Sequence, residues 1–262
     1  MTTESILLIG RGTRATRAVL ETHADRLAAR TRVDSVEVAV YEHEPLRELR
    51  GTVEGLSADT VYAVPMCTAH TYDTVDEIPA LLSYAAGTVR YCEPVGQSPA
   101  VTNVLAERGA ELVSPGEDAS LVLVGFGSSS KPHNRQTVDH HAARLRERSA
   151  YGSVLTCYLL QNPAVECVRY NLTTPRAVAV PVFVAPSEIT DDRIPAALEL
   201  ARGGLEYADP LGEHPRVTDA VHGEIEKRRA LARDDSASTE AVDARPTRTP
   251  RPVSTDGEGL SE

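Results

Sequence analysis

The sequence predicts an α/β protein built from two tandem copies of one doubly wound, parallel four-stranded sheet, with a disordered C-terminal tail. Three features of the 262 residues support this prediction: an internal repeat, an alternation of short apolar runs with helix-like stretches in each copy, and a final segment that has almost no large apolar side chains. The third feature separates the tail from the two folded copies.

The repeat is visible as four blocks that return in the same order at an offset of about 116 residues. Four ordered matches at a nearly constant offset indicate a duplicated fold. The matched blocks are ILLIGRGT (6–13) with LVLVGFGS (121–128), ETHADRLAAR (21–30) with DHHAARLRER (139–148), 63–82 with 179–198, and YCEPVGQSPAVT (91–102) with YADPLGEHPRVT (207–218).

The apolar runs of each copy predict strands, and the stretches between them predict helices. The strand runs are apolar on both faces, which is typical of buried parallel strands joined by right-handed crossovers. In the first copy we expect strands at 6–9, 36–41, 60–64 and 88–91 and helices at 15–30, 46–56, 75–86 and 99–108. In the second copy we expect strands at 121–124, 154–159, 177–182 and 205–207.

The predicted domains are 1–112, 119–232 and a tail at 233–262, with a connection at 108–118 between the first two. The tail is rich in Ser, Thr, Pro and charged residues. Such a segment cannot bury enough apolar surface to offset the entropy lost on ordering, so we expect it to be disordered.

The charge balance excludes several function classes. With 38 acidic against 27 basic residues the formal net charge is −11, which argues against nucleic acid as a partner.

The chain contains no apolar run long enough to span a membrane and no secretory signal pattern, so we expect a cytoplasmic protein. Only two of the 27 basic residues are lysines. An acidic, lysine-poor surface suits a salt-rich cytoplasm, and the alternative is GC-rich coding, which favours arginine codons. The four cysteines form no CxxC pair, which favours buried free thiols.

Ligands of open parallel sheets bind at the carboxyl ends of the strands, where the first predicted strand is followed by GRGTRATR. A tight glycine turn that exposes amides at a helix N-terminus, next to arginines, favours a polycarboxylate ligand. The alternative is an ordinary strand–helix turn with solvated arginines, and neither GxGxxG nor a Walker motif is present. The candidate ligand-binding residues are Gly10, Arg11, Gly12, Thr13 and Arg14, with Ser128 and Lys131 in the matching loop of the second copy.

Acidic and imidazole side chains follow the next two strands of the first copy. Glu42 comes after the second strand, and His70 and Asp73 come after the third. Together these groups could form a weak, open site for a divalent metal or supply a general base. Each has a plainer alternative, because Glu42 precedes a helix and a loop histidine is commonly a surface residue. The helical histidines, at positions 23, 140 and 141, are expected to have packing or solvated roles.

Over residues 5–230 the sequence resembles the class II tetrapyrrole chelatases, especially the two-domain sirohydrochlorin chelatases of the CbiX and SirB type. Members typically read VGHGS after the first strand, FLE…EP at the second and a histidine before DIP after the third. The corresponding segments here are IGRGT (9–13), VYEHEP (40–45) and PMCTAHTYDTVDEIP (65–79), and YCEPVGQSP (91–99) is similar to the family's PLGxxP element. The resemblance implies a chelatase-like, flavodoxin-like fold in each copy.

The resemblance also implies an activity: insertion of Co²⁺ or Fe²⁺ into sirohydrochlorin for cobalamin or sirohaem biosynthesis. The metal is then a substrate and no external cofactor is needed. The anionic tetrapyrrole would lie in the cleft between the two copies, and one covalently duplicated chain could act as a monomer, although the oligomeric state stays open. The implied catalytic residues are Glu42 and His70, and the implied metal ligands are Glu42, His70 and Asp73.

This chain departs from the family pattern at several positions. Arg11 stands where members have their first histidine, and an arginine can neither ligate a metal nor accept a proton. The position of the second family histidine falls on Asp73 without a gap and on His70 with a local shift. In the second copy the equivalent residues are Phe126, Leu160 and Ile189, so no catalytic set is present there.

Two functions therefore remain open for this chain. One is a working chelatase in which Arg11 grips a substrate carboxylate. The other is a catalytically degenerate relative that binds a tetrapyrrole or metal without insertion. A third interpretation, a flavodoxin-like nucleotide binder, has no phosphate-binding fingerprint to support it.

Overall fold

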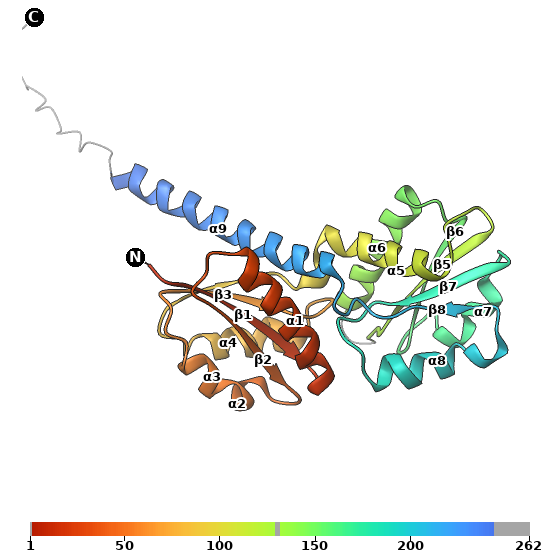
Figure 1. Cartoon of the computed structure of the whole chain (residues 1–262), viewed down its shortest axis with the longest axis horizontal. Helices are drawn as coiled ribbons and strands as arrows, with labels where there is room; N and C mark the ends of the chain where they lie inside the picture. The colour runs from red at the N-terminus through yellow and green to blue at the C-terminus, as the bar shows by residue number, and fades with distance from the viewer. Residues whose placement is uncertain (1, 129–131, 244–262) are drawn as a thin grey trace, which may run out of the picture. The chain divides into compact units, whose positions relative to one another are not determined.

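The computed structural model describes residues 2–128 and 132–243, with side chains described as far as residue 233 (Figure 1). The chain divides into two compact units, residues 1–228 and 229–262. The larger unit contains two four-stranded parallel sheets with helices on both faces, which confirms the predicted fold class. We refer to the parts that hold the first and second sheets as the first half and the second half.

The first sheet has the strand order β2-β1-β3-β4, with all neighbours parallel. The order reverses beside β1, so the carboxyl ends of β1 and β3 flank the point where ligands bind in such sheets. The elements are β1 (Glu4–Arg11), α1 (Arg14–Arg30), β2 (Ser35–Tyr41), α2 (Pro45–Glu48), α3 (Arg50–Glu54), β3 (Thr60–Pro65), a π-helical turn (Asp73–Glu77), α4 (Ile78–Leu82), β4 (Thr88–Tyr91), a 3₁₀ turn (Val95–Gln97) and α5 (Pro99–Leu112).

The second sheet repeats this topology in the order β6-β5-β7-β8. The elements are β5 (Ala119–Gly125), α6 (His133–Arg148), β6 (Ser153–Tyr158), a 3₁₀ turn (Val165–Cys167), α7 (Val168–Asn171), β7 (Arg176–Pro181), a π-helical turn (Ile189–Arg193), α8 (Ile194–Ala197), a 3₁₀ turn (Leu200–Arg202), β8 (Glu206–Tyr207) and α9 (Pro215–Asp243). The two π-helical turns occupy matching positions, so the duplication extends to local backbone detail.

Three predicted segments differ most from the structure. The helix expected at 46–56 is two short helices, because Leu49 ends α2 and begins α3. The helix expected at 75–86 begins as a π-helical turn at Asp73 and ends at Leu82. Helix α9 continues to Asp243, past the expected start of the tail at 233; the rest of the predicted tail, 244–262, lies outside the described residues.

Alternating side chains of the central strands fill the cores on the two faces of each sheet. Leu7 and Ile9 of β1 pack in a cluster with α3 and α4. Val122 and Val124 of β5 pack in an equivalent cluster with α7 and α8. The opposite faces of both sheets, which include Leu8 of β1, contribute to one continuous cluster that spans the two halves.

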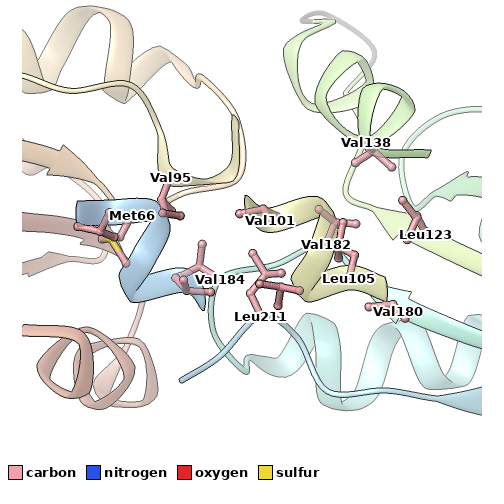
Figure 2. Packing of buried hydrophobic residues seen from close by; sticks show 14 of the residues in the cluster. Met66, Val95, Val101, Leu105, Leu123, Val138, Val180, Val182, Val184 and Leu211 are labelled. Carbon is pink, nitrogen blue, oxygen red and sulfur yellow. The ribbon is translucent and has the colours of Figure 1, made fainter. Parts of the chain in front are cut away.

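The continuous cluster exists because the two halves exchange their last helices. Helix α5, which ends the first repeat in sequence, packs against α6 and β7 of the second half. Figure 2 shows Val101 and Leu105 of α5 among Leu123, Val138 and Val180 of the second half. In the same way α9 follows the second repeat but contacts the first half, where its Asp219 accepts a hydrogen bond from the Arg30 guanidinium at 2.5 Å.

A pair of equivalent buried histidines holds the exchanged helices. His141 on α6 contacts the Gly96 carbonyl at 2.7 Å and the Thr102 hydroxyl at 2.8 Å. His23 on α1 contacts the Gly212 carbonyl at 3.0 Å and the Thr218 hydroxyl at 2.9 Å. A carbonyl only accepts, so Nε2 of each ring carries the proton and Nδ1 accepts from the threonine. The packing role expected of these two histidines is confirmed.

Burial keeps both of these imidazoles neutral. It lowers the pKa of His141 to about 4, and it lowers the pKa of His23 as well.

Two smaller expectations can be compared with the structure. All four cysteines are free, as expected, but only Cys92 and Cys157 are buried: Cys67 is partly buried, and Cys167 is exposed because it lies at the end of a surface 3₁₀ turn. Within the described residues, no helix has the length and apolar character needed to cross a membrane.

Candidate functional site

The turn between β1 and α1 is shaped by two glycines. A Cβ on Gly10 would lie 2.8 Å from the Leu20 side chain, so this position accommodates no larger residue without a shift. Gly12 has φ +152°, which L side chains rarely adopt, and a Cβ there would lie 2.0 Å from Thr16 Oγ1. These constraints bring the chain directly from the end of β1 into α1 and place the N-terminus of that helix at the carboxyl edge of the sheet.

A cavity of about 350 Å³ opens at this edge, between the two halves. This volume lies at the lower end of the range for small-molecule pockets. We call it the cleft pocket. Its walls come from the ends of β1, β3 and β7: Arg11, Gly12, Thr13, Thr16, Met66, Cys67 and Thr68 from the first half, and Phe183, Val184, Ala185, Ser187, Glu188 and Ile189 from the second.

Arg11 enters the cleft pocket but is partly engaged by its own half. Its Nε donates to the Glu42 carbonyl at 3.1 Å, and its Nη1 lies 3.5 Å from Asp73 Oδ2. The same carboxylate oxygen accepts a 2.9 Å hydrogen bond from the Tyr41 hydroxyl. Burial and this hydrogen bond raise the pKa of Tyr41, so the phenol stays protonated. Since 60% of the Arg11 side chain is exposed, the guanidinium keeps donors available for a ligand.

Glu42 lies in an exposed loop that a second carboxylate organises. The backbone N–H groups of Glu42, His43 and Glu44 all donate to the Glu48 carboxylate, at 2.8 to 2.9 Å. These three donors lower the pKa of Glu48 to about 2. Glu48 is therefore a structural anion, and it leaves the Glu42 side chain at the carboxyl edge of the sheet.

His70 is oriented by an acidic partner from the segment after β4. Its Nε2 lies 2.9 Å from Glu93 Oε2, and its Nδ1 lies 3.4 Å from Thr74 Oγ1. Glu93 also accepts a 3.3 Å hydrogen bond from Arg228 of α9. The His70 ring lines a second cavity of about 440 Å³, together with Gln97 and side chains of α6.

The predicted metal ligands are not gathered into one group. Among the residues that the structure describes, no three His, Cys, Asp or Glu side chains are arranged as a metal site. Asp73 is engaged by Arg11 and Tyr41, and His70 turns to Glu93, which explains why the set Glu42, His70 and Asp73 is not assembled. The assignment of these residues to the chemistry stays a prediction.

The structure places the remaining candidates differently. Gly12 and Thr13 line the cleft pocket, whereas Arg14 is exposed on the first turn of α1. In the second half the Ser128 amide donates to the Gln161 side chain at 3.0 Å. Lys131 lies outside the described residues.

Sequence reasoning missed Tyr41, Glu48 and Glu93, which shape the site without carrying a motif of their own. Only Glu48 had a local signal, an acidic side chain shortly after a chain reversal. The pairing of Glu93 with His70 joins residues 23 positions apart and could not be read from spacing. Cys67 also lines the pocket, and burial raises the pKa of its thiol to about 12, so it is a neutral group there.

Comparison with known proteins identifies relatives of the whole larger unit. The CbiX family model matches residues 5–112 and 120–228, one match for each half. A probable sirohydrochlorin cobaltochelatase of Halobacterium salinarum is 25% identical over 222 residues, which cover 73% of this chain and 75% of that protein.

Solved structures show the same fold. SirB from Bacillus subtilis, in a structure with Fe³⁺, superposes with a TM-score of 0.74 at 20% identity, covering 89% of this chain and 98% of that chain. DR2241 from Deinococcus radiodurans, a multi-domain protein with structural similarity to chelatases, gives a TM-score of 0.72 at 22% identity over 86% of this chain. The present chain spans only 55% of the length of DR2241. Since the family model matches both halves in full, this chain belongs to the CbiX family.

Proposed function

We propose that this protein is a sirohydrochlorin chelatase that inserts Co²⁺, or Fe²⁺ in its place, into the macrocycle held in the cleft pocket. Membership of the CbiX family supports the reaction class. The name of the Halobacterium salinarum relative supports cobalt as the metal and, with it, cobalamin biosynthesis as the pathway. The ion is a substrate in this proposal, and no resident cofactor is required.

The observation that carries the proposal is the unequal character of the two pocket walls. The first half contributes a cation, Arg11, and hydroxyl side chains such as Thr13 and Thr16, beside the less polar Met66 and Cys67. The second half contributes four apolar side chains, Phe183, Val184, Ala185 and Ile189, and two polar ones, Ser187 and Glu188. An apolar wall suits the face of a flat conjugated ring, and a cationic wall suits the carboxylates at its rim.

The residue roles follow from this placement. Arg11 is positioned to bind a rim carboxylate, because it keeps free donors beside the pocket while Asp73 and the Glu42 carbonyl fix its orientation. Metal insertion releases two pyrrole protons. Glu42 and His70 are the groups assigned to accept them and to guide the ion, since a carboxylate and an imidazole can each do both.

The test is the rate of cobalt insertion. Purified protein, sirohydrochlorin and Co²⁺ should show a faster absorbance change than Co²⁺ and sirohydrochlorin alone. Glu42→Ala and His70→Ala should each lower the protein-dependent rate by roughly tenfold or more, as expected when a positioned proton acceptor is removed. Glu44→Ala is the matched control, because it removes a neighbouring exposed carboxylate of the same loop. A wild-type rate equal to the protein-free rate would refute the chelatase proposal.

One observation favours the second candidate, a relative that binds a tetrapyrrole without inserting a metal. Arg11, at the position of the first family histidine, is tied to Asp73, so neither side chain is available to hold an ion. A protein-dependent shift of the sirohydrochlorin spectrum, with insertion no faster than in the protein-free mixture, would support this candidate over the first.

A further inference from the structure

The second half contributes one acidic side chain to the cleft pocket, Glu188, which is exposed and directly precedes the π-helical turn after β7. Among the pocket-lining residues that the structure describes, it is the only carboxylate and Arg11 is the only cation. Arg11 pairs with Asp73 rather than with Glu188. Within residues 2–128 and 132–233 no group donates a hydrogen bond to the Glu188 side chain or pairs with it, so its charge is available to a ligand.

The backbone that carries Glu188 is held by a buried threonine. The Ser187 amide donates to Thr190 Oγ1 at 2.8 Å, and this hydroxyl donates back to the Ser187 carbonyl at 2.9 Å. The Thr190 carbonyl in turn accepts a 2.8 Å hydrogen bond from the Tyr207 hydroxyl of β8. Thr190 is 1% exposed, so the closed turn is anchored in the core and presents Glu188 from a fixed position.

The same turn occurs in the first half with a different side chain at the corresponding position. There the Thr71 amide donates to Thr74 Oγ1 at 2.8 Å, and the Tyr91 hydroxyl donates to the Thr74 carbonyl at 2.8 Å. In the matched blocks 63–82 and 179–198, Glu188 corresponds to Tyr72. The duplication therefore preserved the turn, and only the second copy places a carboxylate on it.

Glu188 is also the pocket-lining group best suited to accept a proton. The Arg11 guanidinium is always protonated, and burial raises the pKa of the Cys67 thiol to about 12, so that group is neutral. The other polar lining side chains are hydroxyls, which are weak bases. Glu42 and His70, the acceptors assigned above, are not among the residues described as lining this pocket. A carboxylate such as Glu188 is an effective general base.

The neighbours of Glu188 indicate which part of the macrocycle it would meet. Phe183 and Val184 belong to the same wall and suit the face of a conjugated ring. A carboxylate among them would repel the anionic rim, but it would attract the pyrrole N–H groups at the centre of the ring. Its charge is therefore better placed for the chemistry of the ring centre than for substrate binding.

We propose that Glu188 is a further catalytic residue, supplied by the second half, that accepts a pyrrole proton during metal insertion. The N–H bond breaks, and its electron pair stays on the nitrogen and forms the bond to the metal. The carboxylate becomes a carboxylic acid and loses the proton to water after the product leaves. This role rests on the proposed chelatase function.

The test is the steady-state rate of Co²⁺ insertion into sirohydrochlorin by the full chain. Glu188→Gln keeps the shape of the side chain but removes the proton acceptor, so kcat should fall by roughly tenfold or more. The KM for sirohydrochlorin should stay the same or fall, because a charge that repels the rim is lost. Glu188→Asp, which retains a carboxylate on a shorter side chain, should recover part of the lost kcat. Asp192→Asn is the matched control, since Asp192 is an exposed carboxylate of the same turn outside the pocket lining, and both constants should be unchanged.

The possible outcomes separate this role from the proposed function. If the wild type inserts Co²⁺ faster than the protein-free mixture and Glu188→Gln has the same kcat, the role of Glu188 is wrong while the chelatase function stands. A raised KM with an unchanged kcat would also overturn it, because Glu188 would then serve binding alone. A wild-type rate equal to the protein-free rate would refute the chelatase function, and the role of Glu188 with it.

Discussion

The buried histidine that joins α6 to the segment before α5 should make stability fall in mild acid. His141 lies in a site where its Nε2 hydrogen faces the Gly96 carbonyl and its Nδ1 accepts from Thr102. Desolvation by burial holds its pKa at about 4, against 6.5 for an exposed imidazole. Folding therefore favours the neutral ring, and acid favours the unfolded chain, where the ring can be protonated.

The sign and size of the effect follow from these two pKa values. Above pH 6.5 the ring is neutral in both states and the site contributes its full stabilisation. As the pH falls from 6.5 toward 4 the unfolded chain gains a proton that the folded protein does not, and the stabilisation is lost. At about 1.4 kcal/mol per pKa unit, the loss over this window is about 3 kcal/mol. His23 acts in the same direction, since burial lowers its pKa too.

The assay is urea unfolding followed by circular dichroism at half-unit steps from pH 7.5 to 4. Other groups also contribute to the slope, so the informative quantity is the difference between the wild type and His141→Gln, which retains a donor and an acceptor but does not titrate. The variant should be less stable at pH 7.5 by about 1–3 kcal/mol, because a buried polar group is left imperfectly paired. Its free energy of unfolding should then fall by about 3 kcal/mol less than that of the wild type on acidification.

His43→Gln removes an exposed imidazole and should leave the pH dependence of the free energy of unfolding as in the wild type. The double variant His23→Gln/His141→Gln should show a weaker pH dependence than His141→Gln alone. If the free energy of unfolding fell equally with pH in the wild type and in His141→Gln, the acid sensitivity would not come from the buried His141 imidazole.

Four further outcomes are expected. The urea midpoint should rise with KCl into the molar range if the net charge of −11 reflects adaptation to salt, and no gain would favour GC-rich coding as the cause. Leu105→Ala should lower the free energy of unfolding by about 2–5 kcal/mol, because the side chain is fully buried in the core of the second half. Glu48→Gln should speed amide hydrogen exchange at residues 42–44, because the carboxylate that accepts from these amides is lost. In the wild type the carboxylate should protect these amides above pH 4.5, and the protection should fade as the pH drops toward the lowered pKa of Glu48, about 2. Arg11→Ala should weaken sirohydrochlorin affinity more than Co²⁺ affinity, measured by spectral titration, while Arg14→Ala changes neither.

The duplicated sheets could be predicted from sequence because their signal is local and repeated. Continuous apolar runs are typical of parallel strands buried on both faces, as β1 and β5 are, and every expected strand is present. The position of the cleft was also predictable, since parallel topology places the loops after β1 and β3 at one edge. What the pattern could not supply was the partner of each polar side chain. Asp73 resembles a ligand in sequence, yet Tyr41 and Arg11 use its carboxylate.

The helix exchange shows why this limit is a physical one. A repeat gives the same sequence pattern whether its last helix returns to its own sheet or crosses to the other, because both sheets present equivalent apolar faces to equivalent helices. The two arrangements differ only in which copy supplies each contact. The buried histidines show the arrangement that forms: His23 contacts Gly212 and Thr218, and His141 contacts the equivalent pair, Gly96 and Thr102, in the opposite repeat. Neither ring is satisfied from within its own repeat, so four buried hydrogen bonds join the two repeats, and each repeat needs the other to pair its buried imidazole.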